Sequence, residues 1–126
     1  MNKYQAWHEF WSSFGWAAYN ENTVPDDAME LNDNRYITYE SCSDSFGNVN
    51  LVTASLYHRS TSWVTIHAKA EEIAERIKRM YPPSIEIDGG RMKIRTGQPF
   101  ASDMKDEDDT IRRVRLNVLL EFMTAW

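Results

Sequence analysis

The chain has 126 residues, enough for one domain but too few for two, so we expect a single domain over residues 1–126. Hydrophobic residues make up 42% of the sequence and charged residues 26%, a composition that supports a sizeable core and excludes intrinsic disorder. The formal net charge of −5 leaves no overall basic surface and argues against tight sequence-specific DNA binding.

The N-terminal segment is predicted to form an amphipathic helix from about Lys3 to Phe14. Tyr4, Trp7, Trp11 and Phe14 recur at spacings of three, four and three, which places them on one stripe that faces the core. The aromatics off this stripe, which we expect to add surface for an interface, are Phe10, Trp16 and Tyr19. Polar residues interrupt the segment, so it is no signal peptide, and no apolar run has membrane-spanning length.

Residues 19–35 are rich in turn formers without apolar periodicity, so we expect a long surface connection. A β-hairpin follows, with arms at Tyr36–Ser43 and Val49–His58 around Asp44–Asn48. Neither face of the second arm is strongly polar, which predicts partial cover on both. Cys42, the only cysteine, fits a reducing compartment and is interpreted as a small buried thiol.

A second helix is expected from about Trp63 to Met80. Its core face carries Ile66, Ala70, Ile73 and Ile77. Pro82-Pro83 ends it, and a tight hairpin follows, with arms at Ile85–Asp88 and Arg91–Arg95 joined by Gly89-Gly90. The last strand has the clearest alternation, with core positions at Val114, Leu116, Val118, Leu120 and Phe122. We therefore predict an α+β fold in the order α-β-β-α-β-β-β, with two helices packed on a mainly antiparallel sheet of about five strands.

The segment from Asp103 to Asp109 has five acidic residues and one lysine, a net charge of −4. Together with Pro99 and Phe100 it is expected to form a loop of about a dozen residues between Gly97 and Asp109. Exposed apolar side chains beside a dense negative field would suit a protein partner or a charged passage. The candidate residues for this partner or lumen loop are Phe100, Asp103, Met104, Asp106, Glu107, Asp108 and Asp109. A purely solvated loop is the alternative.

Enzyme signatures are mostly absent, because the sequence has no dinucleotide fingerprint, phosphate-binding loop, nucleophile elbow or CxxC. His8-Glu9 begins like a zinc HExxH, but Ser12 occupies the position of the second histidine. The acidic segment lacks the EF-hand register. We expect no catalytic residue, no metal site and no cofactor, and we interpret His58 and His67 as structural residues.

In their order, several short motifs resemble the tail terminator, or tail completion, proteins of long-tailed bacteriophages. They are Asn22-Thr23-Val24-Pro25-Asp26-Asp27 before Tyr36-Ile37-Thr38-Tyr39, then Ser45-Phe46-Gly47, Ser60-Thr61-Ser62-Trp63, Asp88-Gly89-Gly90, Gly97-Gln98-Pro99-Phe100, Asp108-Asp109 and Arg112-Arg113. Each piece alone is weakly specific. Their order and spacing, over nearly the whole chain, carry the resemblance.

The resemblance implies a structural virion assembly protein without catalytic activity. Such subunits form a hexameric ring that caps the tail tube and joins the tail to the head. The implied partners are further copies of the chain, the tail-tube protein, head-tail connector proteins and DNA that passes through the lumen without sequence-specific binding. No membrane is involved, and the expected location is the host cytoplasm during assembly and then the virion tail.

Three alternatives stay open at this point. The first is a head-tail adaptor or tail-tube subunit, which belongs to the same structural class. The second is a metal-dependent hydrolase that uses the acidic 103–109 segment with His58 or His67. The third is a small-ligand sensor domain, which would need a concave apolar pocket.

Overall fold

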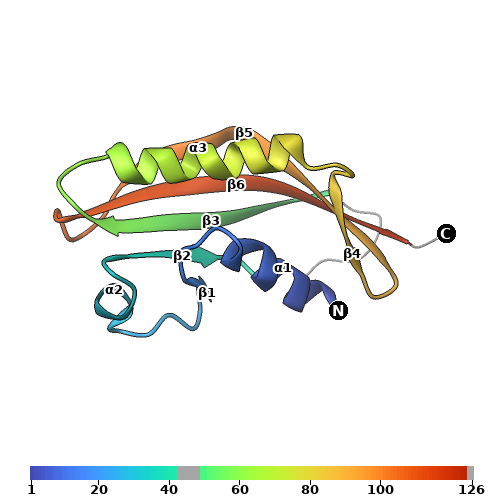
Figure 1. The fold of residues 1–126 in the computed structure, drawn as a ribbon, viewed down its shortest axis with the longest axis horizontal. Helices are drawn as coiled ribbons and strands as arrows, with labels where there is room; N and C mark the ends of the chain where they lie inside the picture. The colour runs from blue at the N-terminus through green and yellow to red at the C-terminus, as the bar shows by residue number, and fades with distance from the viewer. Residues whose placement is uncertain (43–48, 125–126) are drawn as a thin grey trace.

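The protein is described here by a computed structural model that covers residues 1–42 and 49–124. Its elements are α1 (Lys3–Ser12), β1 (Ala18–Asn20), α2 (Ala28–Leu31), β2 (Arg35–Tyr39), β3 (Val49–Arg59), α3 (Val64–Arg79), β4 (Ser84–Ile87), β5 (Gly90–Lys105) and β6 (Ile111–Thr124). The strands form one six-stranded sheet in the order β1-β2-β3-β6-β5-β4. All neighbours are antiparallel except β1 and β2. Figure 1 shows α3 lying along the long strands β5, β6 and β3.

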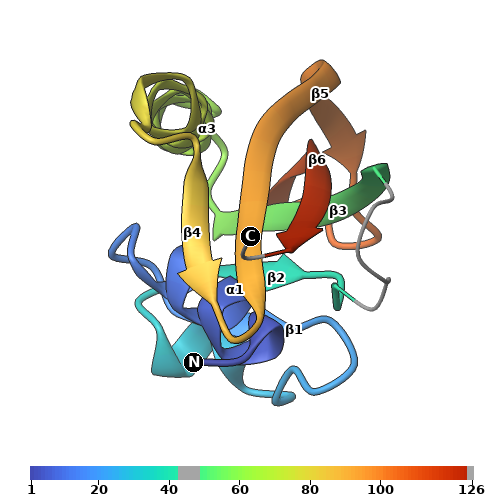
Figure 2. The same ribbon diagram turned by 90° about the vertical axis from the view of Figure 1, so that its right-hand side faces the viewer.

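The sheet is curled into a half-barrel, and the two long helices α1 and α3 lie inside the curl (Figure 2). The predicted α+β class is therefore confirmed, with two substantial helices on a mostly antiparallel sheet. The structure adds the strand β1 and the short helix α2 to the expected order. Turn residues 44–48 of the predicted first hairpin lie outside the described residues, but its arms pair as β2 and β3.

The core lies between the inner face of the sheet and the two long helices. The predicted core residues of β6 are all at most 1% exposed: Val114, Leu116, Val118, Leu120 and Phe122. The predicted face of α3 is buried as well, at Ile66, Ala70, Ile73 and Ile77. The spacing of apolar residues in α3 follows the helical repeat, and that in β6 follows the two-residue repeat of a strand. The predicted core faces of both elements are therefore confirmed.

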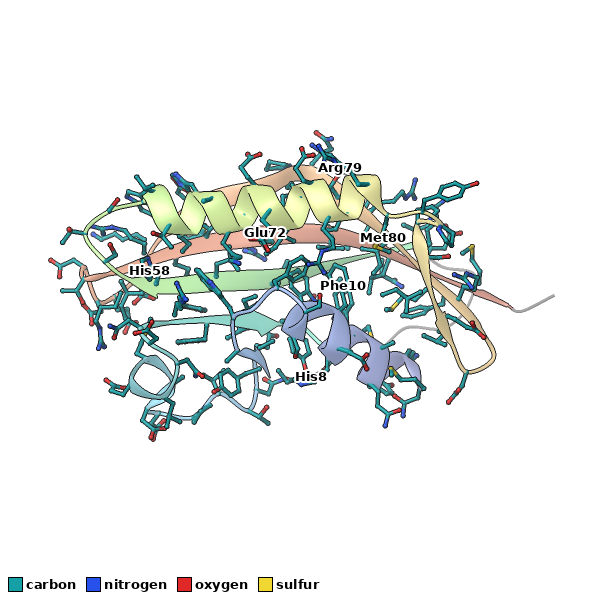
Figure 3. All side chains as sticks on the ribbon, viewed as in Figure 1. His8, Phe10, His58, Glu72, Arg79 and Met80 are labelled. Carbon is teal, nitrogen blue, oxygen red and sulfur yellow. The ribbon has the colours of Figure 1, made fainter. Side chains whose placement is uncertain are left out.

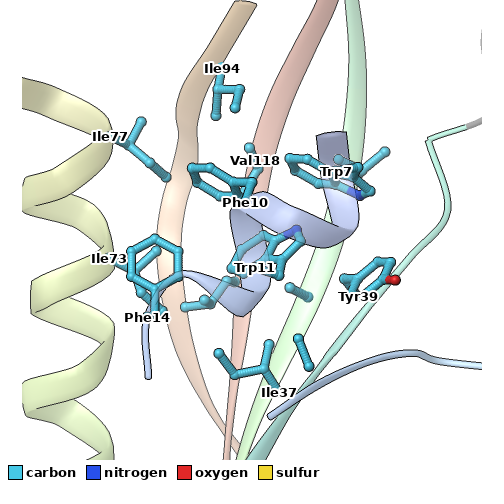
Figure 4. Close-up of a cluster of buried hydrophobic side chains, with 14 of the residues drawn as sticks. Trp7, Phe10, Trp11, Phe14, Ile37, Tyr39, Ile73, Ile77, Ile94 and Val118 are labelled. Atoms are coloured by element: carbon cyan, nitrogen blue, oxygen red, sulfur yellow. The ribbon is translucent and has the colours of Figure 1, made fainter. Parts of the chain in front are cut away.

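Helix α1 buries a wider arc than the predicted stripe. It begins at a capping box, in which the Asn2 side chain accepts a hydrogen bond from the Gln5 amide at 2.9 Å. Phe10 and Trp16, expected to be surplus surface, are buried, whereas Tyr4 is 53% exposed. Figure 4 shows Phe10 between Ile77 of α3 and Val118 of β6, so α1 buries side chains against the other helix as well as against the sheet.

The predicted connection over residues 19–35 contains two elements that the sequence analysis missed. Three residues of β1 pair in parallel with β2, and α2 buries Ala28 and Met29. Asp33 and Asn34 then adopt φ angles of 56° and 65°, a left-handed turn that their side chains tolerate. Elements of three and four residues are too short to show a periodic sequence pattern. They form because tertiary packing and strand pairing stabilise them.

The predicted loop between Gly97 and Asp109 is wrong for most of its length. Strand β5 continues to Lys105, and only residues 106–110 separate it from β6. The pairing with β6 shifts between Thr96 and Ala101, so residues 97–100 bulge out opposite Asn117. Glycine and proline there indicated a loop, but a bulge accommodates both without ending the strand. Phe100 packs against the core.

Candidate functional site

The acidic segment lies at one end of the molecule, where β5 turns into β6 (Figure 1). Asp103 and Met104 belong to β5, so they are strand residues rather than loop residues. The remaining acids, Asp106–Asp109, form the turn itself, which we call the acidic turn. The same end of the molecule carries α2 and the start of α3, and Figure 3 places His58 there as well.

Hydrogen bonds within the acidic turn fix its backbone. The Asp108 carboxylate accepts from the Thr110 amide at 2.9 Å and from the Thr110 hydroxyl at 2.6 Å. These two bonds lower the pKa of Asp108 below its usual value. Asp106 accepts from the Asp108 amide at 3.3 Å. Glu107 and Asp109 are exposed, and among residues 1–42 and 49–124 their carboxylates have no ion-pair partner. The turn therefore presents these two carboxylates to solvent.

A chain of contacts connects β5 and β6 to the start of α3. Asp103 on β5 lies 2.8 Å from Nε2 of His67, and both side chains are about half exposed. The His67 ring stacks on Trp63 at 5.3 Å, and the Arg112 guanidinium lies over the Trp63 ring at 5.4 Å. Arg112 also donates to the Thr61 carbonyl at 3.2 Å. Asp103 therefore has a structural role, because its contact with His67 helps to hold the β5–β6 hairpin against α3.

In the described part of the chain, no three His, Cys, Asp or Glu side chains lie close enough together to hold a metal ion. His67 contacts Asp103, but His58 lies near Trp16, at 6.1 Å between ring centroids. His8 bonds Tyr39 Oη through Nδ1 at 2.7 Å. The histidines that the hydrolase alternative would need are thus engaged separately.

Cys42 is buried, and burial raises the pKa of its thiol above the usual value. Its Sγ atom lies 3.6 Å from the Lys3 carbonyl oxygen, to which it donates. A raised pKa keeps the sulfur protonated at neutral pH, where the thiol is a poor nucleophile.

A surface hollow of about 320 Å³ lies between α1, the end of α3 and β4. Phe10, Met80 and Ile85 contribute apolar surface to it, while Glu9 and Arg76 add charge. Figure 3 shows Phe10 and Met80 on facing elements. Its volume is at the lower limit for small-molecule sites, which are typically about 300–1,000 Å³. The hollow is where the small-ligand alternative would be tested.

The sheet has a second face, which neither α1 nor α3 covers and which we call the open face. Cross-strand partners share a face, so the register assigns its members. They are Tyr19, Tyr36, Thr38, Val49, Leu51, Thr53, Ser55 and Tyr57 on β1 to β3, and Arg113, Arg115, Asn117, Leu119, Glu121, Arg91, Lys93, Arg95, Ser102 and Met104 on β6 and β5. The sequence analysis expected partial cover on both faces of β3, and on the open face Ser55 is only 7% exposed, whereas Leu51 is 60% and Val49 50% exposed.

Near the acidic turn, the open face carries a row of stacked rings. Tyr36 stacks on Tyr57 at 4.9 Å and meets Tyr19 edge-on at 6.1 Å. Arg113 lies over Tyr57 at 5.4 Å. Burial is the main cause that raises the pKa of Tyr36, and the Tyr57 and Asp106 side chains add to the rise. The rings therefore cover one another, and the row reaches the acidic turn.

The opposite end of the open face is basic. Arg91, Lys93 and Arg95, which we call the basic patch, face outward there beside the exposed Leu51. Arg91 is held in place because its Nε donates a hydrogen bond to the Ser84 hydroxyl oxygen at 2.7 Å. Glu121 is the direct partner of Lys93, and Glu86 of Arg91, so three cations stand against two carboxylates. The sequence analysis missed this patch, although the alternation of Arg91, Lys93 and Arg95 with Met92 and Ile94 was a signal for it.

Comparison with protein-family models, with curated proteins and with solved structures gives no match for this chain. Among the described residues, no helix is long and apolar enough to cross a membrane.

Proposed function

We propose that this chain is a structural assembly subunit that forms a closed ring, of the tail terminator type that caps a tail tube and joins tail to head. The observation that carries the proposal is the pair of unlike surfaces on one copy: an acidic turn at one end and a basic patch with exposed apolar residues on the open face at the other. The order of motifs in the sequence supports the same function.

Unlike surfaces favour a particular symmetry. When one surface of a subunit binds a different surface of the next copy, the contact is heterologous, and successive copies close into a ring or extend into a filament. A two-fold dimer that packs two open faces antiparallel would also pair acid with base, in two equivalent contacts, so the mass of the oligomer has to distinguish a dimer from a ring. The proposed ring is a hexamer, with the tail-tube protein and head-tail connector proteins as its axial partners and DNA passing through its lumen.

A head-tail adaptor or tail-tube subunit is the alternative within the same structural class. The two differ in what happens after one ring has formed, because a tube subunit stacks into long polymers and a terminator stops. Native mass spectrometry over a range of protein concentrations, followed by electron microscopy of the same samples, measures both outcomes. We expect a closed oligomer of defined mass without long tubes.

Other results would contradict the proposal. Long tubes would assign the chain to the tube subunits, and an exclusively monomeric protein at all concentrations would remove the ring. Addition of a divalent cation serves as a control for the hydrolase alternative. Tight binding measured by calorimetry, together with hydrolysis of a phosphoester substrate, would favour that alternative.

A further inference from the structure

The basic patch is the part of the open face in which cations without ion-pair partners lie beside exposed aliphatic side chains. Arg95 is exposed, and in the described part of the chain neither Arg95 nor Lys93 has an ion-pair partner within 4 Å. Beside them Leu51 is 60% exposed and Val49 50%. A surface that combines free cations with exposed aliphatic side chains suits a partner with carboxylates and apolar groups.

The acidic end of the molecule has both. Glu107 and Asp109 extend into solvent from the acidic turn, and Val64 at the start of α3 is 76% exposed. Figure 1 shows the turn and the start of α3 at the same end of the molecule, while the β4–β5 hairpin lies at the other. The chain therefore carries, at its two ends, groups that complement each other in charge and in apolar character.

One copy cannot join these surfaces by itself. Lys93 pairs with Glu121, whereas Arg113 lies on the same face of β6 near the acidic turn. Eight strand residues at about 3.3 Å each separate the two positions by roughly 26 Å along a rigid strand. The acidic turn can reach a basic patch only on another molecule.

We infer that the acidic turn of one copy docks on the basic patch of the next, and that this contact links neighbouring subunits. The inference rests on the proposed ring, which it deepens by naming the two surfaces that meet. A stable contact covers about 800 Å² on each partner, so two contacts per copy would use about a fifth of the 7229 Å² surface.

Nucleic acid is the other polyanion that a basic patch suggests, but the open face fits it less well. Single-stranded nucleic acid is bound by aromatic rings that stack on its bases. Here the tyrosines stack on one another, with Arg113 over Tyr57, so their faces are already occupied. Asp106 and Glu121 also place negative charge on or beside the same face, where they would repel phosphates.

Charge reversal on each side, followed by mixing, tests the contact. One variant carries Lys93→Glu and Arg95→Glu, and the other carries Glu107→Lys and Asp109→Lys. Each alone should lose self-association, by at least about tenfold in the apparent dissociation constant, because like charges then face each other. Mixed in equal amounts, the two variants should associate again in alternation, since each reversed surface finds its complement on the other variant. Sedimentation velocity at low and high salt measures all three samples.

A matched control reverses charges elsewhere. Glu71→Lys with Lys78→Glu, on the exposed side of α3, keeps the net charge and should leave association unchanged. A second measurement is disulfide cross-linking, in which the native Cys42 does not compete because it is buried. The variants Arg95→Cys and Glu107→Cys are made separately and mixed under oxidising conditions. We expect one disulfide-linked species that contains both variants, in preference to either homodimer.

The outcomes separate the inference from the proposed function. A ring that persists in both charge-reversed variants overturns the docking contact and leaves the ring standing. An open filament that is lost in both variants keeps the contact and overturns the ring. A native chain that stays monomeric overturns both. Binding of a DNA duplex that is lost in the Lys93→Glu/Arg95→Glu variant, with unchanged self-association, would assign the patch to phosphates instead.

Discussion

On β6, Leu116 and Val118 point into the curl of the sheet and are fully buried, whereas Arg115 and Asn117 point to the open face and keep contact with solvent. Adjacent residues of one strand thus lie in different environments, one in the core and the other at the surface. The inner face removes apolar surface from water and supplies most of the folding free energy. The open face contributes little to that core, so its charges and exposed aliphatic residues can change with little effect on folding.

The largest expected effect comes from placing a charge on the inner face. Val118→Asp would bury an unpaired carboxylate among Leu116 and its neighbours, at a cost of about 4 kcal/mol or more, so that little folded protein is expected. Leu119→Asp, one residue later on the open face, should cost about 1 kcal/mol or less. Chemical denaturation of both variants measures the difference. Equal stability would mean that the two faces are wrongly assigned.

The aromatic residues of α1 extend the comparison to the helix. Phe10→Ala should lower the free energy of unfolding by about 3–5 kcal/mol, because Phe10 is buried between α1, α3 and the sheet. Tyr4→Ala should change it by about 0.5 kcal/mol, since Tyr4 is 53% exposed. Thermal unfolding of the two variants checks the ranking. The reverse order would restore the stripe that the sequence predicted.

A smaller effect is expected at the bulge of β5. A Cβ atom at Gly97 would lie 2.9 Å from Asn117 Cβ and 3.0 Å from the Asn117 carbonyl oxygen. Because a backbone atom is involved, Gly97→Ala should cost about 1–3 kcal/mol. Asn117→Ala removes only the hydrogen bond to the Pro99 carbonyl and should cost about 1 kcal/mol. If Gly97→Ala is neutral in urea denaturation, the close approach of the two strands is wrong.

The smallest effect concerns His58 and the pH dependence of stability. Burial, and then the nearby Arg35, lower the pKa of His58 below its usual 6.5. As the pH falls through 6.5, the unfolded chain therefore binds a proton before the folded chain does, and the folded state loses stability until the lowered pKa is reached. His58→Gln should remove this loss. Unfolding curves at a series of pH values between 7 and 5 compare the two proteins, and parallel curves would contradict the shift.

The sequence predicted those parts of the fold in which one long element has one covered side. The period of α3 and of β6 gave their core residues correctly because each repeats over many positions. The bulge in β5 was missed because glycine and proline are equally typical of loops. The wide buried arc of α1 was missed because it depends on the curl of the sheet, which no local pattern records.

The candidate site also has one part that the sequence indicated and one part that it did not. Charge density along the chain was enough to indicate the acidic turn. The basic residues of the patch alternate with Met92 and Ile94 along β5, but the exposed Val49 and Leu51 beside them come from β3 and are placed there only by register. A one-residue error in pairing would have moved Lys93 and Arg95 to the inner face.

Strand β4 pairs only with Gly90–Lys93, so from Arg95 onward β5 has no strand partner on its outer side within the described residues. An exposed strand edge of this length is a template on which another chain can add a strand and start aggregation. The bulge at residues 97–100 interrupts that template in its middle, and Pro99 removes one of its amide donors. The same irregularity that hid the strand in the sequence thus protects the chain from uncontrolled strand pairing with other copies.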